Sequence, residues 1–347
     1  MPNTMPAAFF AGVRKLELRT VPIPEPGPGE VRVDVRASGL CGSDLHQFEG
    51  RWEQPPFVPG HEVAGEITAV GAGVCGWQVG DRVCVEPFLY CGRCCYCLTG
   101  RYFHCEAMGF LTLTAHGGFG EAMVCPQYTL YRLPGNVGYE TGALAEPLAV
   151  GVHAVRLAHV SGADEVLVLG AGTIGLMSAL AARAFGARTV AITARHRHQA
   201  RMARELGLEV VLPTEAEALA AAVAEVFPRG PSVVLETVGS AHGTFQQAVQ
   251  LAGKLGRVAL VGGNTGPVDS FDFAPVSAKE LTVYGSGAYA QIGTRRDFAV
   301  ALDLLESDPE LYVKIITHRF DLVDIQRAFE IAGDKAAQEA VKVMMVR

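Results

Sequence analysis

From about residue 165 onward, short apolar runs alternate with amphipathic stretches. The apolar runs have the length of strands and are rich in Val, Leu and Ile; they lie at 165–169, 189–193, 209–212, 232–236, 257–261 and 281–284. The segments between them have helical periodicity, for example at 174–185, 197–206 and 215–226. Six apolar strands joined by crossover helices predict an α/β fold with a doubly wound parallel sheet.

The pattern on either side of this region is different. Residues 1–35 form short β-like runs broken by prolines, and further strands are predicted at 63–70 and 82–86. After about residue 288, two helical patches at 296–305 and 323–332 precede a last strand at 340–346. We therefore expect two domains, with boundaries near residues 150 and 288.

Composition and charge narrow the function classes. The chain is 49% hydrophobic and 19% charged, which predicts a large core, and its net charge of −7 argues against nucleic-acid or anionic-membrane partners. The longest uncharged apolar run, 166–182, is marginal for a membrane span and is interrupted by glycines. Because no targeting segment is evident at the N-terminus, we expect a cytoplasmic protein.

Four cysteines at C-x2-C-x2-C-x7-C spacing carry the strongest chemical signal: Cys91, Cys94, Cys97 and Cys105. Four soft sulfur ligands with no open position indicate a structural zinc site. The alternatives are disulfides, which a reducing compartment disfavours, and an iron–sulfur cluster, whose bacterial motif has a shorter last step. Cys95 is a surplus thiol within the run and leaves the ligand assignment open.

A glycine motif follows the first predicted strand of the sheet. Gly170, Gly172 and Gly175 form G-x-G-x-x-G between a strand and an apolar helix, and Thr173 and Ile174 complete the motif. In this context the glycines allow a tight turn, close approach of a pyrophosphate and close packing of helix on strand. We expect a dinucleotide to bind at the start of this helix.

A second candidate metal site lies upstream, where Cys41 and His61 have zinc-type side chains on separate loops. Taken alone, each has a structural alternative, because a lone Cys is commonly a small hydrophobe. Together with C-G-S-D-x-H at 41–46, G-H-E at 60–62, the four-cysteine lobe and the glycine motif, however, the chain resembles the zinc-dependent medium-chain dehydrogenase/reductase family, closest to its polyol and sorbitol dehydrogenase branch.

The resemblance implies an architecture. It assigns 1–150 to a GroES-like, mostly-β catalytic domain with the zinc lobe at 88–106. It assigns 151–288 to a Rossmann dinucleotide-binding domain, and 289–347 to a return into the catalytic domain. It also implies two zinc ions per chain, one structural and one catalytic, and a homodimer or homotetramer.

The resemblance further implies the ligands of the catalytic zinc. Alcohol dehydrogenases of the family supply a further Cys after the lobe, but this chain has an E-P-L segment beginning at Glu146, like polyol and threonine dehydrogenases. Cys41, His61, Glu62 and Glu146 are therefore the expected ligands, with one carboxylate bound directly or through water. A structural alternative for Glu146 is a carboxylate favoured by a helix N-terminus.

In this family zinc binds the alcohol oxygen, a nicotinamide cofactor accepts hydride, and a hydroxyl–ribose–histidine relay removes the proton. The resemblance places Ser43 and His46 in that relay. Asp44 is a candidate acceptor for the other nitrogen of His61, and the alternative is a local turn or cap carboxylate. Ser43 could equally be a helix N-cap and His46 a surface histidine.

The second strand of the sheet bears on the choice of cofactor. Folds that bind NAD place an acid there to hold the ribose 2′-hydroxyl, but here the position is Ala194, followed by Arg195 and Arg197. A guanidinium can bind a 2′-phosphate, so we expect NADP(H) in preference to NAD(H). The alternative is a basic loop at the start of a solvated helix.

The substrate is less determined. Tyr289 matches a residue near the polyol in sorbitol dehydrogenases, whereas Ala288 replaces their arginine; Phe48 and Trp52 could wall an apolar pocket or serve packing. We predict an oxidoreductase acting on a secondary alcohol or polyol, or on the ketone in reverse. The alternatives are a threonine-type amino-alcohol dehydrogenase using NAD(H) and a non-catalytic redox-sensing protein.

Overall fold

The computed structural model describes residues 4–114, 116–239, 243–263 and 270–347. The chain divides into two compact units. Unit 1 comprises Met1–Glu146 and Leu305–Arg347, and unit 2 comprises Pro147–Leu304. The domain boundaries expected from the sequence, after residues 150 and 288, stay a prediction, and each unit is described below by itself.

The first segment of unit 1 is mostly β-structure. Its elements are β1 (Thr4–Gly12), β2 (Lys15–Pro22), β3 (Glu30–Gly39), α1 (Gly42–Phe48), β4 (Glu62–Val70), β5 (Arg82–Val85), β6 (Phe88–Leu89), α2 (Cys95–Leu98), η1 (Tyr102–His104), β7 (Gly109–Phe110), α3 (Leu111–Thr114), β8 (Ala122–Pro126), η2 (Gln127–Thr129), β9 (Leu130–Arg132) and α4 (Tyr139–Ala143). Helix α5 (Ala145–Leu157) begins with the last two residues of this segment.

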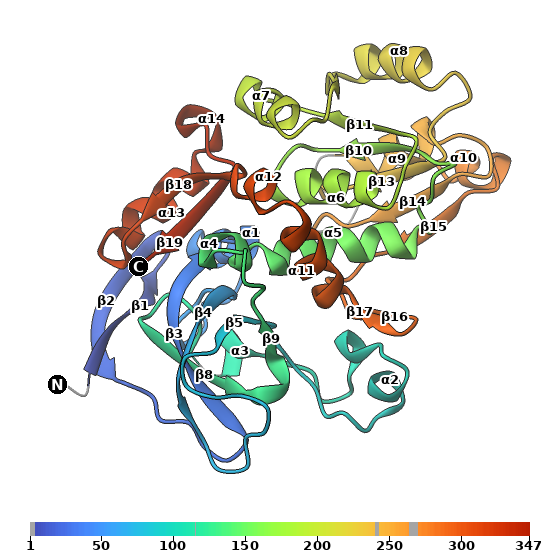
Figure 1. Cartoon of the computed structure of the whole chain (residues 1–347). Helices are drawn as coiled ribbons and strands as arrows, with labels where there is room; N and C mark the ends of the chain where they lie inside the picture. The colour runs from blue at the N-terminus through green and yellow to red at the C-terminus, as the bar shows by residue number, and fades with distance from the viewer. Residues whose placement is uncertain (1–3, 115, 240–242, 264–269) are drawn as a thin grey trace. The chain divides into compact units, whose positions relative to one another are not determined.

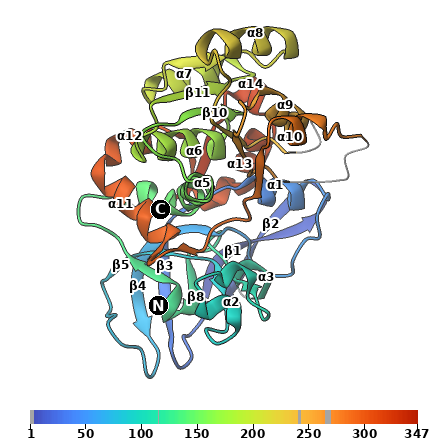
Figure 2. The same ribbon diagram turned by 90° about the vertical axis from the view of Figure 1, so that its right-hand side faces the viewer.

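The C-terminal segment adds strands and helices to the same unit. After α11 (Asp297–Ser307) come α12 (Pro309–Val313), β18 (Ile316–Phe320), η4 (Leu322–Asp324), α13 (Ile325–Gly333), α14 (Lys335–Gln338) and β19 (Lys342–Val346). In the main sheet the strand order is β18-β19-β3-β4-β5-β9, and β8 also pairs with β3. Figures 1 and 2 both show β3, β4 and β5 side by side.

Alternate residues of β3 are buried and contribute to the hydrophobic core beneath this sheet. Val31, Val33 and Val35 face inward and pack with side chains of β4, β5 and β8. At its far end β3 pairs with β4 on one side and with β19 on the other. The last residues of β3, the first residue of β4 and the first residue of β19 therefore meet, and this junction positions the candidate metal site.

Unit 2 contains the parallel sheet. Its elements are β10 (Glu165–Leu169), α6 (Thr173–Ala184), β11 (Thr189–Thr193), α7 (Arg197–Glu205), β12 (Val210–Leu212), α8 (Ala216–Val226), β13 (Val233–Glu236), α9 (Thr244–Leu251), β14 (Arg257–Leu260), α10 (Ala274–Ala278), β15 (Thr282–Gly285), β16 (Gln291–Ile292) and β17 (Arg295–Arg296).

The strand order in unit 2 is β12-β11-β10-β13-β14-β15, and every neighbouring pair is parallel. Helix α6 packs against β10 and β11, whereas α9 packs against β13 and β14 (Figure 1). The order reverses between β10 and β13, which is the arrangement of a doubly wound sheet. The six strands predicted from apolar runs are thus confirmed, and no end shifts by more than one residue.

Membrane insertion through a helix has no support in the described residues, because none of their helices is long and apolar enough to span a bilayer.

Candidate metal and cofactor sites

The four cysteines of the predicted structural zinc site come together in unit 1. The sulfur atoms of Cys91, Cys94, Cys97 and Cys105 all lie within 4.8 Å of one another. The Sγ atoms of Cys94 and Cys97 are 3.6 Å apart, and those of Cys91 and Cys97 are 4.0 Å apart. Zinc–sulfur bonds of about 2.3 Å in a tetrahedron place the sulfur atoms about 3.8 Å apart, so the group fits a zinc ion.

Backbone N–H groups point at the sulfur atoms of this lobe. The N–H groups of Cys91 and Ala107 each donate to Cys105 Sγ at 3.3 Å, which suits a metal-bound thiolate. Backbone donors from Cys97 and Glu106 lower the pKa of the Cys94 thiol to about 6. Burial and the neighbouring thiols raise the pKa of Cys97 to about 12. Cys95 is exposed and outside the group, which removes the ambiguity in the sequence.

A second group unites Cys41, His61 and Glu62, whose ligand atoms also lie within 4.8 Å of one another. Cys41 is the N-cap of α1, and its N–H donates to Asp44 Oδ2 at 2.9 Å in a capping box. This cap fixes the start of the helix and so the place of the thiol. Glu62 is the first residue of β4, opposite the end of β3, and His61 directly precedes it.

Glycine at the end of β3 leaves room for the carboxylate of this group. A Cβ on Gly39 would lie 1.9 Å from Glu62 Oε2, so no other residue fits without displacing the carboxylate. Glu62 is itself only 1% exposed and forms an ion pair with Lys342, the first residue of β19. The Lys342 ammonium also donates to the Leu40 carbonyl at 3.1 Å. The pair satisfies both charges inside the protein.

Sequence reasoning missed Lys342. The available signal was a lysine in the middle of the apolar strand predicted at 340–346, since a lysine is almost never fully buried unless it is paired. Its partner could not be read from local pattern, because Glu62 is distant in the sequence.

Electrostatics at His61 depend on its neighbours. Burial alone would lower the pKa of His61, but Asp44 and Cys41, with a smaller contribution from Glu146, raise it well above its ordinary value. His61 Nδ1 lies 3.7 Å from Asp44 Oδ1, which is within ion-pair range but too long for a hydrogen bond. Asp44 thus lies beside the His61 ring and also serves the helix cap through its other oxygen, and its role as an acceptor for His61 stays a prediction.

Glu146, the fourth expected ligand, is buried near the start of α5. Its carboxylate acts electrostatically on His61. It is not part of the close group formed by Cys41, His61 and Glu62 within the described part of the chain. Glu146 is thus near the site, and its role as a ligand stays a prediction.

The two residues of the predicted proton relay lie on α1. Ser43 is in the first turn and half-buried, and His46 follows within the same short helix. The His46 ring lies against Trp52, with ring centroids 4.9 Å apart. Burial and then Arg51 lower the pKa of His46, so its imidazole is neutral near pH 7 and able to accept a proton.

The glycine motif of unit 2 has the geometry that a dinucleotide turn requires. Gly170 has φ +101°, and a Cβ on Gly175 would lie 1.8 Å from the Gly170 carbonyl oxygen. Gly172 is the N-cap of α6 and has open space beside it. Thr173 and Ile174 therefore lie in the first turn of this helix, where dinucleotide-binding folds place the phosphates.

The end of β11 lies beside this glycine turn, because the Gly170 N–H donates to Thr193 Oγ1 at 2.8 Å. Ala194 and the exposed Arg195 follow directly. Arg197, also exposed, opens α7. Two guanidinium groups and no carboxylate thus occupy the 194–197 segment.

Two residues considered for the substrate pocket belong to cores. Phe48 is 2% exposed and packs against Phe329, with ring centroids 5.1 Å apart. Tyr289 is 0% exposed and packs against Phe298 in unit 2. Packing against neighbouring aromatic rings accounts for both positions.

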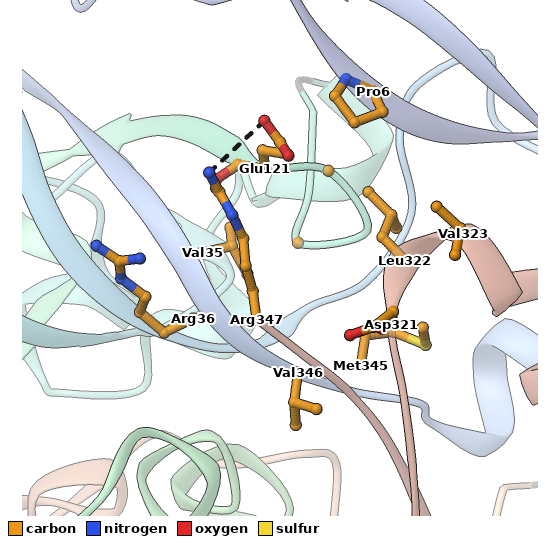
Figure 3. A pocket seen from close by; sticks show the side chains of 12 residues that line it. Pro6, Val35, Arg36, Glu121, Asp321, Leu322, Val323, Met345, Val346 and Arg347 are labelled. Carbon is orange, nitrogen blue, oxygen red and sulfur yellow. Dashed lines mark hydrogen bonds and ion pairs between the residues drawn. The ribbon is translucent and has the colours of Figure 1, made fainter.

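A separate cavity of about 250 Å³ lies in unit 1 and involves none of the predicted site residues. Figure 3 shows its lining: the Arg347 guanidinium points toward Glu121, while Leu322 and Val323 stand on the opposite wall. It is not the site of the predicted chemistry.

Comparison with known proteins identifies the two parts of the chain. A family model described as an alcohol dehydrogenase GroES-like domain matches residues 27–135. A second, described as a zinc-binding dehydrogenase, matches residues 173–307. The expected combination of a GroES-like domain and a Rossmann-type domain is confirmed.

Individual relatives match over nearly the whole chain. L-idonate 5-dehydrogenase of Vitis vinifera is 34% identical and covers 97% of this chain and 93% of its own length. Sorbitol dehydrogenase of Bacillus subtilis (strain 168) is 33% identical, and the match covers 99% of this chain and 98% of the relative. A zinc-binding dehydrogenase of Sinorhizobium meliloti 1021, solved with NADP, has a TM-score of 0.90 and 30% identity, covering 99% of both chains. The chain therefore belongs to the zinc-type medium-chain dehydrogenase/reductase family.

Proposed function

We propose that the protein is a zinc-dependent dehydrogenase that transfers hydride between a secondary alcohol or polyol and NADP(H). The observation that carries the proposal is the convergence of Cys41, His61 and Glu62 at one junction of strands, in a family of oxidoreductases. Relatives named for sorbitol and L-idonate favour a polyol. The donor set of one sulfur, one nitrogen and carboxylate oxygen suits a catalytic zinc.

In the proposal, Cys41 and His61 hold the metal together with a carboxylate. Glu62 is already neutralised by Lys342, which favours Glu146 as the carboxylate that binds directly. When bound, zinc would supply a Lewis acid that makes an alcohol more acidic, and the nicotinamide would supply the hydride acceptor.

The chain's own residues carry the proton in this proposal. In the proposal, the Ser43 hydroxyl, two residues after Cys41, accepts a hydrogen bond from the substrate hydroxyl. His46 is the neutral base that takes the proton toward solvent. Its position on the same short helix as Ser43 supports this path.

The pH dependence of alcohol oxidation tests the role of His46. Because Arg51 lowers the pKa of His46, the Arg51→Gln variant is expected to raise that pKa. Oxidation needs the neutral imidazole, so the acidic limb of the kcat–pH profile should move to higher pH. Glu49 acts in the opposite sense, so Glu49→Gln should move the limb to lower pH. A profile unchanged in both variants would remove His46 from the proton path.

NADP(H) is the proposed cofactor because Arg195 and Arg197 flank the place where an acid would select NAD(H). The Sinorhizobium relative solved with NADP supports the proposal. Residues Gly170, Gly172 and Gly175 would hold the pyrophosphate through the turn and the start of α6.

Replacing Arg195 with Ala should lower kcat/KM for NADP far more than for NAD. One charge-assisted contact of about 1–3 kcal/mol corresponds to roughly a tenfold to hundredfold loss. Steady-state kinetics with both cofactors measure it. Arg201→Ala on the same helix, where Arg201 pairs with Glu205, is the matched control and should leave the ratio unchanged. Equal losses with the two cofactors, or a wild type that prefers NAD, would reject the assignment.

The decisive test of the function is a substrate panel run with both cofactors. We expect activity on polyols or secondary alcohols and two zinc ions per chain by elemental analysis. Threonine is included because the amino-alcohol alternative predicts it as the substrate. A protein that binds zinc and cofactor but oxidises nothing in the panel would favour the redox-sensing alternative.

Association of the chain and its place in the cell also stay predictions. Strand β15 forms one edge of the parallel sheet and leaves Thr282, Val283 and Gly285 exposed, which supports pairing with a second copy. A homodimer or homotetramer in the cytoplasm, without nucleic-acid or membrane partners, is the proposed state.

A further inference from the structure

Unit 2 contains a buried carboxylate that neither the metal sites nor the glycine turn uses. Asp297, the first residue of α11, is 0% exposed. Its Oδ2 lies 2.7 Å from His153 Nδ1, and its Oδ1 accepts a hydrogen bond from the Arg156 guanidinium. Both partners lie on α5. Because a buried carboxylate is costly unless it is paired, α5 and α11 are joined at this point by charge and hydrogen bonds.

The same carboxylate fixes the backbone of Ala290. The Ala290 N–H donates to Asp297 Oδ2 at 3.1 Å, and the Asp297 N–H donates to the Ala290 carbonyl at 2.9 Å. Arg156 also donates to the carbonyl of Arg295, in the β16–β17 hairpin, at 3.0 Å. We call His153, Arg156 and Asp297 the clasp, because together they tie the stretch from 290 to 297 to α5.

The segment just before the hairpin depends on contacts of this kind. Residues 286–290 lie between β15 and β16 and belong to neither strand. Ala288 has φ +40°, in the left-handed region that a residue with a Cβ rarely adopts. Such a backbone persists only where the surrounding structure over-determines it. The buried Tyr289 side chain and the two hydrogen bonds between Ala290 and Asp297 supply that restraint.

Segment 286–290 lies at the edge of the sheet where cofactors bind. It follows β15 in a sheet whose neighbouring strands are all parallel, so it shares an edge with the glycine turn that follows β10. Three strand spacings of about 4.8 Å, roughly 14 Å in all, separate the two along this edge, and an extended dinucleotide can bridge that distance. Arg195 follows β11, on the other side of the glycine turn. With the adenosine half at Arg195, the nicotinamide half extends toward segment 286–290.

We propose that the clasp is a positioning device for the cofactor: it holds segment 286–290 in the conformation that orients the nicotinamide ring for hydride transfer. The proposal rests on the function proposed above and adds three positioning residues to it. Asp297 acts through the backbone of Ala290 and contacts neither substrate nor cofactor. The adenosine half, held by the glycine turn and Arg195, is independent of the clasp.

The Asp297→Asn variant tests the clasp, because it changes charge and hydrogen bonding with little change in shape. A carboxylate accepts on both oxygens, whereas an amide turns an N–H donor toward a group that also donates. The link to Ala290 should therefore loosen. With the zinc-loaded enzyme we expect kcat to fall roughly tenfold to a hundredfold, as for loss of a hydrogen bond to a charged group. Asp303→Asn, on the same helix and in an exposed ion pair with Arg295, is the matched control and should leave kcat unchanged.

Cofactor fragments separate a positioning role from a merely structural one. We expect Asp297→Asn to bind NADPH about fivefold or more weakly than the wild type, but to bind its nicotinamide-free fragment 2′,5′-ADP equally well. Calorimetry measures both, and NADH and 5′-ADP are measured in parallel so that the result does not depend on the preferred cofactor. Equal weakening of cofactor and fragment would show general damage to unit 2 and overturn the proposal.

His153 provides a second test, which does not depend on how well Asp297→Asn folds. His153→Asn keeps an N–H donor near the place of Nδ1, whereas His153→Leu removes it. We expect His153→Leu to lower kcat and weaken NADPH binding while leaving 2′,5′-ADP binding unchanged, and His153→Asn to retain most of both wild-type values. Equal effects of the two variants would assign His153 to packing and contradict the clasp.

The binding measurements need no turnover, so they separate this proposal from the function on which it rests. A selective loss of NADPH binding in Asp297→Asn, in a protein that oxidises no substrate of the panel, would retain the effect of the clasp on the cofactor and reject the dehydrogenase. An active dehydrogenase whose kcat and cofactor binding are the same in the wild type and in Asp297→Asn would retain the function and reject the clasp.

Discussion

Replacing Cys41 with Ser is expected to lower kcat for alcohol oxidation by about a thousandfold or more while the chain stays folded. Serine has nearly the shape of cysteine, and the capping hydrogen bond from the backbone of residue 41 to Asp44 does not involve the sulfur. A hydroxyl is a poor zinc ligand at neutral pH, so the metal and several kcal/mol of transition-state stabilisation, on the order of 4, would be lost.

Three measurements check this result: kcat on the preferred substrate, zinc content by elemental analysis and cofactor binding by fluorescence. Zinc should fall from two ions per chain to one, and cofactor binding should persist because the glycine turn is in unit 2. Cys75→Ser is the control, since Cys75 is exposed and outside both ligand groups. Near-normal turnover in Cys41→Ser would show that the catalytic site lies elsewhere.

Replacing Cys94 with Ser is expected to lower the melting temperature substantially, on the order of 10 °C or more. The binding free energy of a four-thiolate zinc site contributes directly to folding of the segment that carries it. Helix α2, which carries Cys97 and begins directly after Cys94, buries none of its side chains and so depends strongly on the metal. A loss of several kcal/mol in a protein of this size corresponds to a shift of about that magnitude.

Cys95→Ser is a closely matched control, because Cys95 is the next residue along the chain but is exposed and outside the zinc group. Calorimetry and zinc analysis should show one zinc fewer in Cys94→Ser and no change in Cys95→Ser. If both variants kept two zinc ions and the wild-type melting temperature, the lobe would not be a structural zinc site.

Sequence pattern predicted the parallel sheet well for a physical reason. Its inner strands are buried on both faces, so they read as continuous apolar runs, and β10 and β11 begin and end at the predicted residues. The glycine turn could also be predicted, because its strand, glycines and helix are contiguous in the sequence. The four-cysteine group could be predicted for the same reason: its ligands lie within one short segment.

What the sequence could not supply was long-range pairing. The partnership of Glu62 with Lys342 depends on β3, β4 and β19 meeting in one sheet, and no local periodicity encodes that meeting. The role of Phe48 was equally ambiguous in the sequence, because an aromatic side chain suits both a hydrophobic core and the wall of an apolar pocket. Short strands such as β6, of two residues, carry too few positions to show any period.

The place of β19 in the sheet has a consequence for biosynthesis. This last strand pairs with β3 and brings in Lys342, so a nascent chain lacking it exposes the edge of β3 and leaves the Glu62 carboxylate without its cation. The N-terminal part of unit 1 therefore cannot reach its native state while it leaves the ribosome. Completion of the metal centre must wait until the C-terminal residues emerge, after the whole of unit 2 has been translated. Truncation of the final strand would consequently damage a site whose ligands were made hundreds of residues earlier.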